Sequence, residues 1–513
     1  QVESRDTPMH VAALCPFTLP EDAPPDFLRT LMAELRSYRE FVPPWNYCLR
    51  SPGLTHLLPV WVEQEELDLE YHLRHLALPR PGGERELGQM IARLHSQPLD
   101  LSRPPWEFHL IEGLEGNRFA IYLKMHHSLI DGISGVRLVT RGMSEDAEQS
   151  RTLPPFWSPG LHKVARRARP EAPPLTLDGV LADVKDVIGA QLRSAPTLAR
   201  AFASMVVPPD DAPGELRLPF AAPRSVLNGR VRGQRRVATQ QFEIARLKAV
   251  AKAAGCTLND VVLALCGGTL RRFLLDEDEL PEEPLTAGVP VSFRPADDEG
   301  AGNAITFAIA NLGTDLEDPF QRLAAVVAST RAAKAHLSTL PREAITQYTV
   351  LLMAPSILSM LTPIGGRTRP MFNVTVSNVP GPPKPLYFRG ARMEAVYPIS
   401  LIAHGIGLNI TCESYAGSLG FAFVGCRDTL PHLQNMARYA AEALAELEAA
   451  YPPASAPKAP LPATAPKARK AAKPRGGRKP AAAEKPSAAA RSRAATKPGA
   501  ARKARPRARR RKT

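Results

Sequence analysis

Cysteine is scarce in this chain, and its six cysteines form no C-x-x-C pair. Most of them lie in apolar surroundings, a pattern that fits reduced thiols in a cytoplasm better than a disulfide framework. The spacing also lacks the paired ligands of a zinc site. We therefore expect free thiols and no structural metal.

Several catalytic and targeting signatures are missing as well. The string Gly132-Ile133-Ser134-Gly135 is not G-x-S-x-G, which excludes the nucleophile elbow of the α/β-hydrolases. No Walker-type loop or dinucleotide fingerprint stands out, and no repeat of solenoid length is visible. No basic-then-apolar signal peptide opens the printed sequence, which begins with Gln1 rather than Met.

Acidic residues are nearly absent from the C-terminal tail. Residues 452–513 hold 20 Lys and Arg against one acid, Glu484. The net charge of +14 for the whole chain therefore corresponds to a net charge near −5 for residues 1–451. Ala, Pro, Lys and Arg dominate this tail, and such a composition cannot bury enough apolar area to fold, so we expect disorder. Its charge favours binding to a polyanion, meaning DNA, RNA or an anionic membrane face. The alternative is a solvated extension that aids solubility.

The body of the chain predicts an α/β architecture, because short apolar runs alternate with helical patterns. At 513 residues two or three domains are expected. We place an N-terminal half at 1–150, a crossover linker at 151–215, a C-terminal half at 216–451 and the tail at 452–513. Helices are expected at 26–35, 86–95, 177–207, 244–254 and 260–275, and strands at 119–125, 237–243, 375–376 and 408–410.

One stretch, from Ala344 to Gly366, contains no charged residue and is long enough for a membrane span of about 20 residues. Pro355 at its centre and Pro363 near its end argue against a span. We interpret it as a kinked, mostly buried helix. A membrane span and an apolar patch that touches a lipid surface remain alternatives.

The most informative motif follows the apolar run 119–125. His126 and His127 end this expected strand, Asp131 and Gly132 come next, and a helix is expected beyond them. A neutral imidazole at a strand end can act as a base near pH 7, and a following helix N-terminus favours its uncharged form. A pair of packing histidines is the alternative.

The spacing His-His-x-x-x-Asp-Gly resembles the signature of the bacterial wax ester synthase/diacylglycerol acyltransferase family, within the CoA-dependent acyltransferase superfamily. Further segments resemble this family in the same order, from about residue 7 to 447. They are Pro104-Pro105-Trp106-Glu107, where the family usually has Pro-Leu-Trp, then 257–261, 289–294, 302–303, 378–382 and 407–411. The resemblance implies two chloramphenicol-acetyltransferase-like domains, each a mixed β-sheet flanked by helices. It also implies an active-site channel at their interface.

The resemblance also implies roles for the motif residues. His127 would be the general base, and His126 would pack or orient. Asp131 would be structural and would pair with Arg294, although Arg271 and Arg272 are equally conceivable from the sequence. Gly132 fits a place where backbone must turn or pass closely.

Four further residues are candidates near this site. Asn259 either caps a helix or makes a polar contact with substrate. Ser292 is either a hydroxyl near the oxyanion or a loop residue. Trp106 is a candidate substrate contact, and Asn378 is expected to fix a turn.

The expected function is O-acyl transfer from fatty acyl-CoA to diacylglycerol or a long-chain alcohol, which gives triacylglycerol or wax ester. Acyl-CoA enters as substrate, and no cofactor, metal or covalent acyl-enzyme is required. Two alternatives stay open: a superfamily acyltransferase for another hydroxyl acceptor, and a binding or scaffold protein of lipid inclusions with weak activity. We expect a cytoplasmic protein, peripheral on a membrane or lipid droplet.

Overall fold

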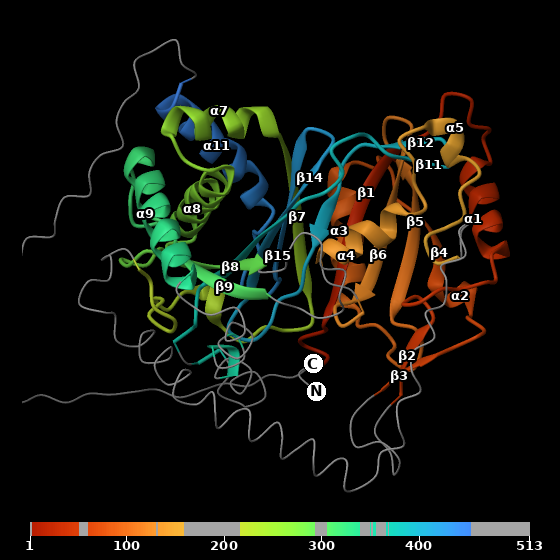
Figure 1. Cartoon of the computed structure of the whole chain (residues 1–513), viewed down its shortest axis with the longest axis horizontal. Coiled ribbons are helices and arrows are strands. Elements are labelled where there is room, and N and C mark those ends of the chain that lie inside the picture. The colour runs from red at the N-terminus through yellow and green to blue at the C-terminus, as the bar shows by residue number, and fades with distance from the viewer. Residues whose placement is uncertain are drawn as a thin grey trace, which may run out of the picture. The chain divides into compact units, whose positions relative to one another are not determined.

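The structure, a computed structural model, describes residues 3–50, 60–129, 132–158, 216–292, 305–338, 349, 352–354, 366–367 and 369–452. Two large β-sheets and their helices make up this part of the chain (Figure 1). The expected helix 177–207, most of the uncharged stretch 344–366 and the tail beyond Pro452 lie outside the described residues.

The first sheet has the strand order β11-β12-β1-β6-β5-β4, with β13 also paired to β1. Only the β4–β5 pair is parallel, so the sheet is mixed. Its strands are β1 (His10–Thr18), β4 (Leu73–Ala77), β5 (Trp106–Leu114), β6 (Arg118–His126), β11 (Tyr387–Phe388), β12 (Ala391–Met393) and β13 (Tyr397–Ile399). A small separate pair is formed by β2 (Tyr47–Arg50) and β3 (Val60–Glu63).

The second sheet has the order β7-β15-β14-β10-β8-β9 and is also mixed, because β10 runs parallel to β14 and β8. Its strands are β7 (Arg235–Glu243), β8 (Thr286–Ser292), β9 (Ile305–Asn311), β10 (Val374–Val379), β14 (Leu408–Tyr415) and β15 (Ser418–Cys426). Two mixed sheets flanked by helices confirm the expected fold class.

Helices accompany both sheets. Those of the N-terminal half are α1 (Phe27–Ser37), α2 (Leu69–His72), α3 (Glu84–Ser96), α4 (Gly132–Thr140) and α5 (Ala147–Ser150). Those of the C-terminal half are the 3-10 turn η1 (Val226–Asn228), α7 (Ile244–Ala254), α8 (Leu258–Asp276), α9 (Pro319–Ser338) and α11 (Asn435–Ala450). Figure 1 shows α7, α8, α9 and α11 gathered beside the second sheet.

The sheets are not each built from one half of the sequence. Strands β11, β12 and β13 come late in the chain, yet β12 and β13 pair with β1 of the first sheet. The segment 387–399 therefore completes the N-terminal sheet. The boundaries placed at 150, 215 and 451 stay predictions.

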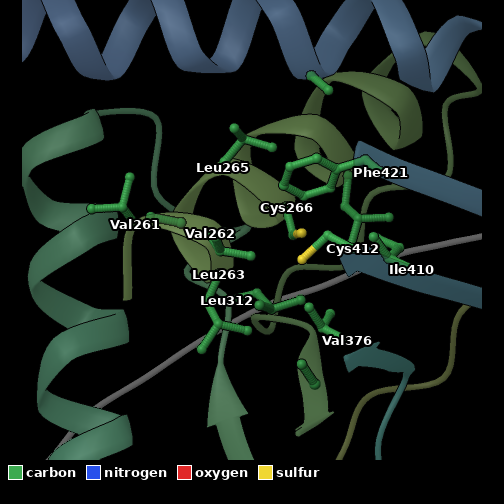
Figure 2. Close-up of a cluster of buried hydrophobic side chains, with 14 of the residues drawn as sticks. Val261, Val262, Leu263, Leu265, Cys266, Leu312, Val376, Ile410, Cys412 and Phe421 are labelled. Atoms are coloured by element: carbon green, nitrogen blue, oxygen red, sulfur yellow. The ribbon is translucent and has the colours of Figure 1, made fainter. Parts of the chain in front are cut away.

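The core of the second sheet lies between its strands and α8. Figure 2 shows Val262 and Cys266 of α8 among Ile410, Cys412 and Phe421 of the facing strands. These side chains are essentially inaccessible to solvent, which explains why α8 is apolar on nearly every face. All six cysteines are free thiols.

Helix α8 begins with a capping box formed by Thr257 and Asp260. The Thr257 side chain accepts from the Asp260 amide at 3.3 Å, and the Asp260 carboxylate accepts from the Thr257 amide at 2.9 Å. Asp260 also accepts from the Thr330 hydroxyl of α9 at 2.7 Å. Asn259 is therefore not the cap, and the expected capping role belongs to its neighbours.

Helix α3 lies where the two sheets meet. Its buried Leu87 and Ile91 belong to one apolar cluster that also contains Val237 of β7 and Val424 of β15. Among the described residues no single helix is long and apolar enough to cross a membrane. Helices α7 and α8 reach that length and composition only together, with a bend of 102° between them.

Candidate active site

The histidine pair stands at the end of a strand that is buried on both sides. Strand β6 pairs with β1 and β5, and its residues from Phe119 to Met125 are all buried. An apolar run between two partner strands gives a rigid base for whatever follows it. His126 is the last strand residue and lies opposite His10 of β1.

His127 is exposed and is anchored through its backbone. Its amide donates to the Met9 carbonyl at 2.9 Å, just before β1 begins. A turn follows, in which the Leu129 amide donates to the His126 carbonyl at 3.0 Å, and α4 then starts at Gly132. The expected order of strand, histidine pair, turn and helix is thus present.

His126 is held by side chains on both ring nitrogens. Its Nδ1 lies 2.5 Å from the Ser128 hydroxyl and also accepts from the Ser128 amide at 3.3 Å. Its Nε2 lies 3.1 Å from Oε2 of Glu3. This geometry suits the orienting role expected for His126.

The expected partners of Asp131 can be placed only in part. Asp131 and Arg294 lie outside the described residues, and their pairing stays a prediction. Arg271 donates to the Thr314 carbonyl at 2.8 Å, whereas Arg272 lies 3.5 Å from a carboxylate oxygen of Glu446. Both alternative arginines are therefore engaged elsewhere.

Trp106 is fully buried at the start of β5. Its indole N–H donates to the Trp45 carbonyl at 2.7 Å, and its ring stacks on His72 at 4.4 Å between centroids. Trp157 stacks on it at 5.7 Å. The structure gives Trp106 a packing role in an aromatic core, and a contact with substrate stays a prediction.

The remaining candidates lie on or beside the second sheet. Ser292 is the last residue of β8, and Asn259 is a half-buried residue in the first turn of α8. Asn378 lies inside β10, so the expectation that it fixes a turn is wrong. Beyond this strand, a Cβ on Gly381 would come within 2.3 Å of the Ser414 carbonyl oxygen, which explains the glycine as a close backbone approach.

A buried ionic group lies on β5 and β6, the second of which ends in the histidine pair, and it was not predicted from the sequence. Lys124 of β6 lies 2.8 Å from Oε2 of Glu107, and His109 lies 3.1 Å from the same oxygen. Burial raises the pKa of Glu107, but the hydrogen bond from His109 and the charge of Lys124 outweigh it and bring the pKa to about 2. A lysine inside an otherwise apolar strand was the available signal, because a buried charge needs a partner.

The same lysine fixes the end of α3. Its Nζ donates to the Leu94 carbonyl at 3.2 Å and to the Gln97 carbonyl at 3.1 Å. Cations at a helix C-terminus satisfy carbonyls that have no partner within the helix. The strand that ends in the histidine pair is thus fastened to the helix at the junction of the sheets.

Neutral histidines fill the space between β1 and α3. His10 hydrogen-bonds through Nε2 to the His95 carbonyl at 3.0 Å, and His95 hydrogen-bonds through Nδ1 to the Tyr122 hydroxyl at 2.9 Å. Burial lowers the pKa of His95 to about 3 and that of His10 well below its ordinary value. These rings therefore act as uncharged packing groups near neutral pH.

Two cavities among the described residues are not lined by His127. One lies against β9 and α9 and is lined by Phe307, Ile309 and Leu337, among others. The other is an open hollow around Arg224 and Glu279. No group of three or more potential metal ligands occurs in the part of the chain that the structure describes. A channel that reaches His127 stays a prediction.

Two mixed sheets flanked by helices, with a histidine presented at the end of a buried strand, define the fold class. The first condensation domain of the calcium-dependent antibiotic synthetase shares this fold, with a TM-score of 0.53 and 18% identity over 88% of this chain and 93% of that one. The wax ester synthase/diacylglycerol acyltransferase from Marinobacter aquaeolei is more similar, with a TM-score of 0.69 and 38% identity over 88% and 96% of the two chains.

Sequence comparisons narrow the class. The wax ester synthase/diacylglycerol acyltransferase catalytic domain matches residues 1–262, and the C-terminal domain of the same family matches residues 301–448. A Mycobacterium tuberculosis protein named as a diacylglycerol O-acyltransferase is 47% identical over 87% of this chain and 95% of its own length. An Acinetobacter baylyi O-acyltransferase is 39% identical over 85% and 92% of the two chains. The chain belongs to the wax ester synthase/diacylglycerol acyltransferase family, and it is an acyltransferase.

Proposed function

We propose that this acyltransferase moves a fatty acyl group from acyl-CoA to the hydroxyl of diacylglycerol or a long-chain alcohol, with His127 as general base. The observation that carries the proposal is the placement of His127. Its backbone is fixed by Met9, yet its side chain is exposed at the end of a buried strand. An imidazole in that position can meet a substrate without a rearrangement of the sheet.

The reaction needs a proton transfer to and from His127 and the transfer of the acyl group from CoA to the acceptor oxygen. His127 takes the proton of the acceptor hydroxyl while the oxygen attacks the thioester carbonyl. The tetrahedral intermediate then collapses, the C–S bond breaks, and the departing CoA thiolate recovers the proton from His127. Polar contacts by Asn259 and Ser292 to substrate or oxyanion, and a channel between the sheets that admits the acyl chain, belong to this proposal.

An acceptor-dependence assay tests the donor and acceptor classes. Purified protein is mixed with palmitoyl-CoA, and free thiol is measured with diacylglycerol, with hexadecanol or with no acceptor. We expect thiol release to rise several-fold with at least one of the two lipid acceptors, together with the matching ester product. Release that responds only to a different alcohol would favour the alternative acceptor. If neither lipid acceptor stimulates release, the result favours the alternative of a lipid-inclusion scaffold protein with weak activity.

We further propose that the protein works in the cytoplasm at the surface of a membrane or lipid droplet, and that its tail binds polyanions. The tail's composition supports polyanion binding, since residues 452–513 carry a net charge near +19. Arginine- and lysine-rich chains gain affinity by releasing condensed counterions, which makes their binding strongly dependent on salt.

Deletion of residues 452–513 is therefore expected to separate binding from turnover. The shortened protein should keep nearly the whole rate of thiol release but lose its salt-sensitive gel shift with DNA. Full-length protein should lose roughly 10³-fold in affinity between 50 and 200 mM salt if six or more phosphates are contacted. Vesicles with and without anionic lipid distinguish a membrane ligand from nucleic acid. An unchanged gel shift after deletion would rule the tail out as the binding segment.

A further inference from the structure

Glu3 contacts His126 and also Met9, the residue that anchors the backbone of His127. Its Oε1 accepts from the Met9 amide at 3.0 Å, and its Oε2 lies 3.1 Å from Nε2 of His126. The Met9 carbonyl in turn accepts the amide of His127 at 2.9 Å. One carboxylate thus holds the His126 ring and also the residue that anchors the His127 backbone.

The contacts of His126 identify which ring nitrogen carries its proton. A backbone amide can only donate, so the contact from the Ser128 amide makes Nδ1 an acceptor. In the neutral ring the proton then sits on Nε2 and is donated to Glu3. The Ser128 hydroxyl lies 2.5 Å from the same Nδ1 and is a second donor to it.

The carboxylate is suited to this role by its surroundings. Burial raises the pKa of Glu3, but the hydrogen bonds from His126 and from the Met9 amide lower it below its ordinary value. The segment that carries Glu3 is also fastened farther along, because Arg235 of β7 donates to the Asp6 carbonyl at 2.8 Å. Glu3 is therefore an ionised acceptor on a backbone held at two places.

We propose that Glu3 is a positioning residue for acyl transfer, which holds the His126 ring and, through Met9, the backbone of His127. The proposal rests on the proposed role of His127 as base. Glu3 itself makes no chemical step. It fixes the angle at which the base is presented, and small misplacements of a reacting group cost large factors in rate.

The test compares Glu3→Ala with Glu3→Gln, because the amide oxygen of glutamine can still accept one of the two hydrogen bonds. We expect Glu3→Ala to lower kcat by about 10- to 100-fold with little change in KM for acyl-CoA, as for other residues that orient a catalytic group. Glu3→Gln should recover part of that loss. Ser128→Ala, which keeps the amide contact, should cost only a few-fold. Glu21→Gln, in an exposed turn of the same half, is the matched control.

A second measurement separates positioning from general stability. In a His126→Ala background the effect of Glu3→Ala on kcat should shrink, because the ring that the carboxylate holds is gone. Wild-type kcat in Glu3→Ala would overturn the proposal, and an equal loss in both backgrounds would overturn the part of it that acts through the His126 ring. If His127→Ala itself retained wild-type turnover, the proposed function would fail instead, so the two failures are distinguishable. Should Glu3→Ala not fold, Glu3→Gln and Ser128→Ala carry the comparison.

Discussion

Replacement of His127 by alanine is expected to slow acyl transfer by about 10²- to 10⁴-fold, the range that removal of a general base produces. The loss should fall on kcat, because the proton is moved in the transition state while acyl-CoA is bound elsewhere. Thiol release from palmitoyl-CoA in the presence of the best acceptor measures it. Since the His127 side chain is exposed, the fold should tolerate the change, and the thermal midpoint should stay close to that of the wild type.

A matched control comes from the C-terminal half. His432 is an exposed histidine just before α11, and His432→Ala should leave both turnover and stability unchanged. Product analysis should show that residual activity in His127→Ala still yields the same ester. Wild-type turnover in His127→Ala would contradict the role of His127 as general base, even though the fold is that of the family.

Replacement of Glu413 by glutamine is expected to stabilise the protein by about 3 kcal/mol at pH 7. Glu413 lies on β14 and is only 4% exposed. Burial raises its pKa to about 8. The folded protein must therefore keep this acid protonated at neutral pH, whereas the unfolded chain ionises it freely. Glutamine has a similar shape and no such cost.

The pH dependence gives the sign of this effect. An acid whose pKa is raised by folding weakens stability as pH rises above its ordinary value near 4.5, and the loss is complete above about 8. The gain from Glu413→Gln should therefore be small at pH 4.5, about 3 kcal/mol at pH 7, and larger at pH 8.5. Thermal midpoints across this range measure it.

Glu283→Gln is the control, because Glu283 is exposed in the same half and its replacement should change little at any pH. A difference between Glu413→Gln and wild type that does not grow with pH would show that the carboxyl is not the source. Loss of turnover in a stabilised Glu413→Gln would connect the buried acid with function, since ionisable groups kept at a cost often serve a site.

Local patterns in the sequence were sufficient to predict the strand that carries the histidine pair and several other elements. The apolar run 119–125 predicted β6, and its two polar ends set the strand limits within a residue. Helix α7 was predicted from one apolar face and from Gly255, which does adopt a left-handed φ of 67°. Such elements are specified by residues close to each other in the chain, so a linear pattern contains the information.

Contacts between distant residues could not be predicted in the same way. Nothing in Glu3 distinguishes it from other acids, because its role depends on His126, far along the chain. Glu107 and Lys124 likewise meet only because β5 and β6 are neighbours. The cap of α8 was different, because Thr257-x-x-Asp260 is a capping signature that lies within four consecutive residues of the sequence.

The late arrival of β12 and β13 in the first sheet has a consequence for synthesis on the ribosome. Until residues 391–399 have been made, β1 has only β6 as a neighbour, and its other edge presents unsatisfied amide and carbonyl groups. The N-terminal sheet therefore cannot close when its own segment leaves the exit tunnel. The nascent chain therefore exposes the unpaired edge of β1 through most of translation, and chaperones or a lipid surface can bind this edge during that time.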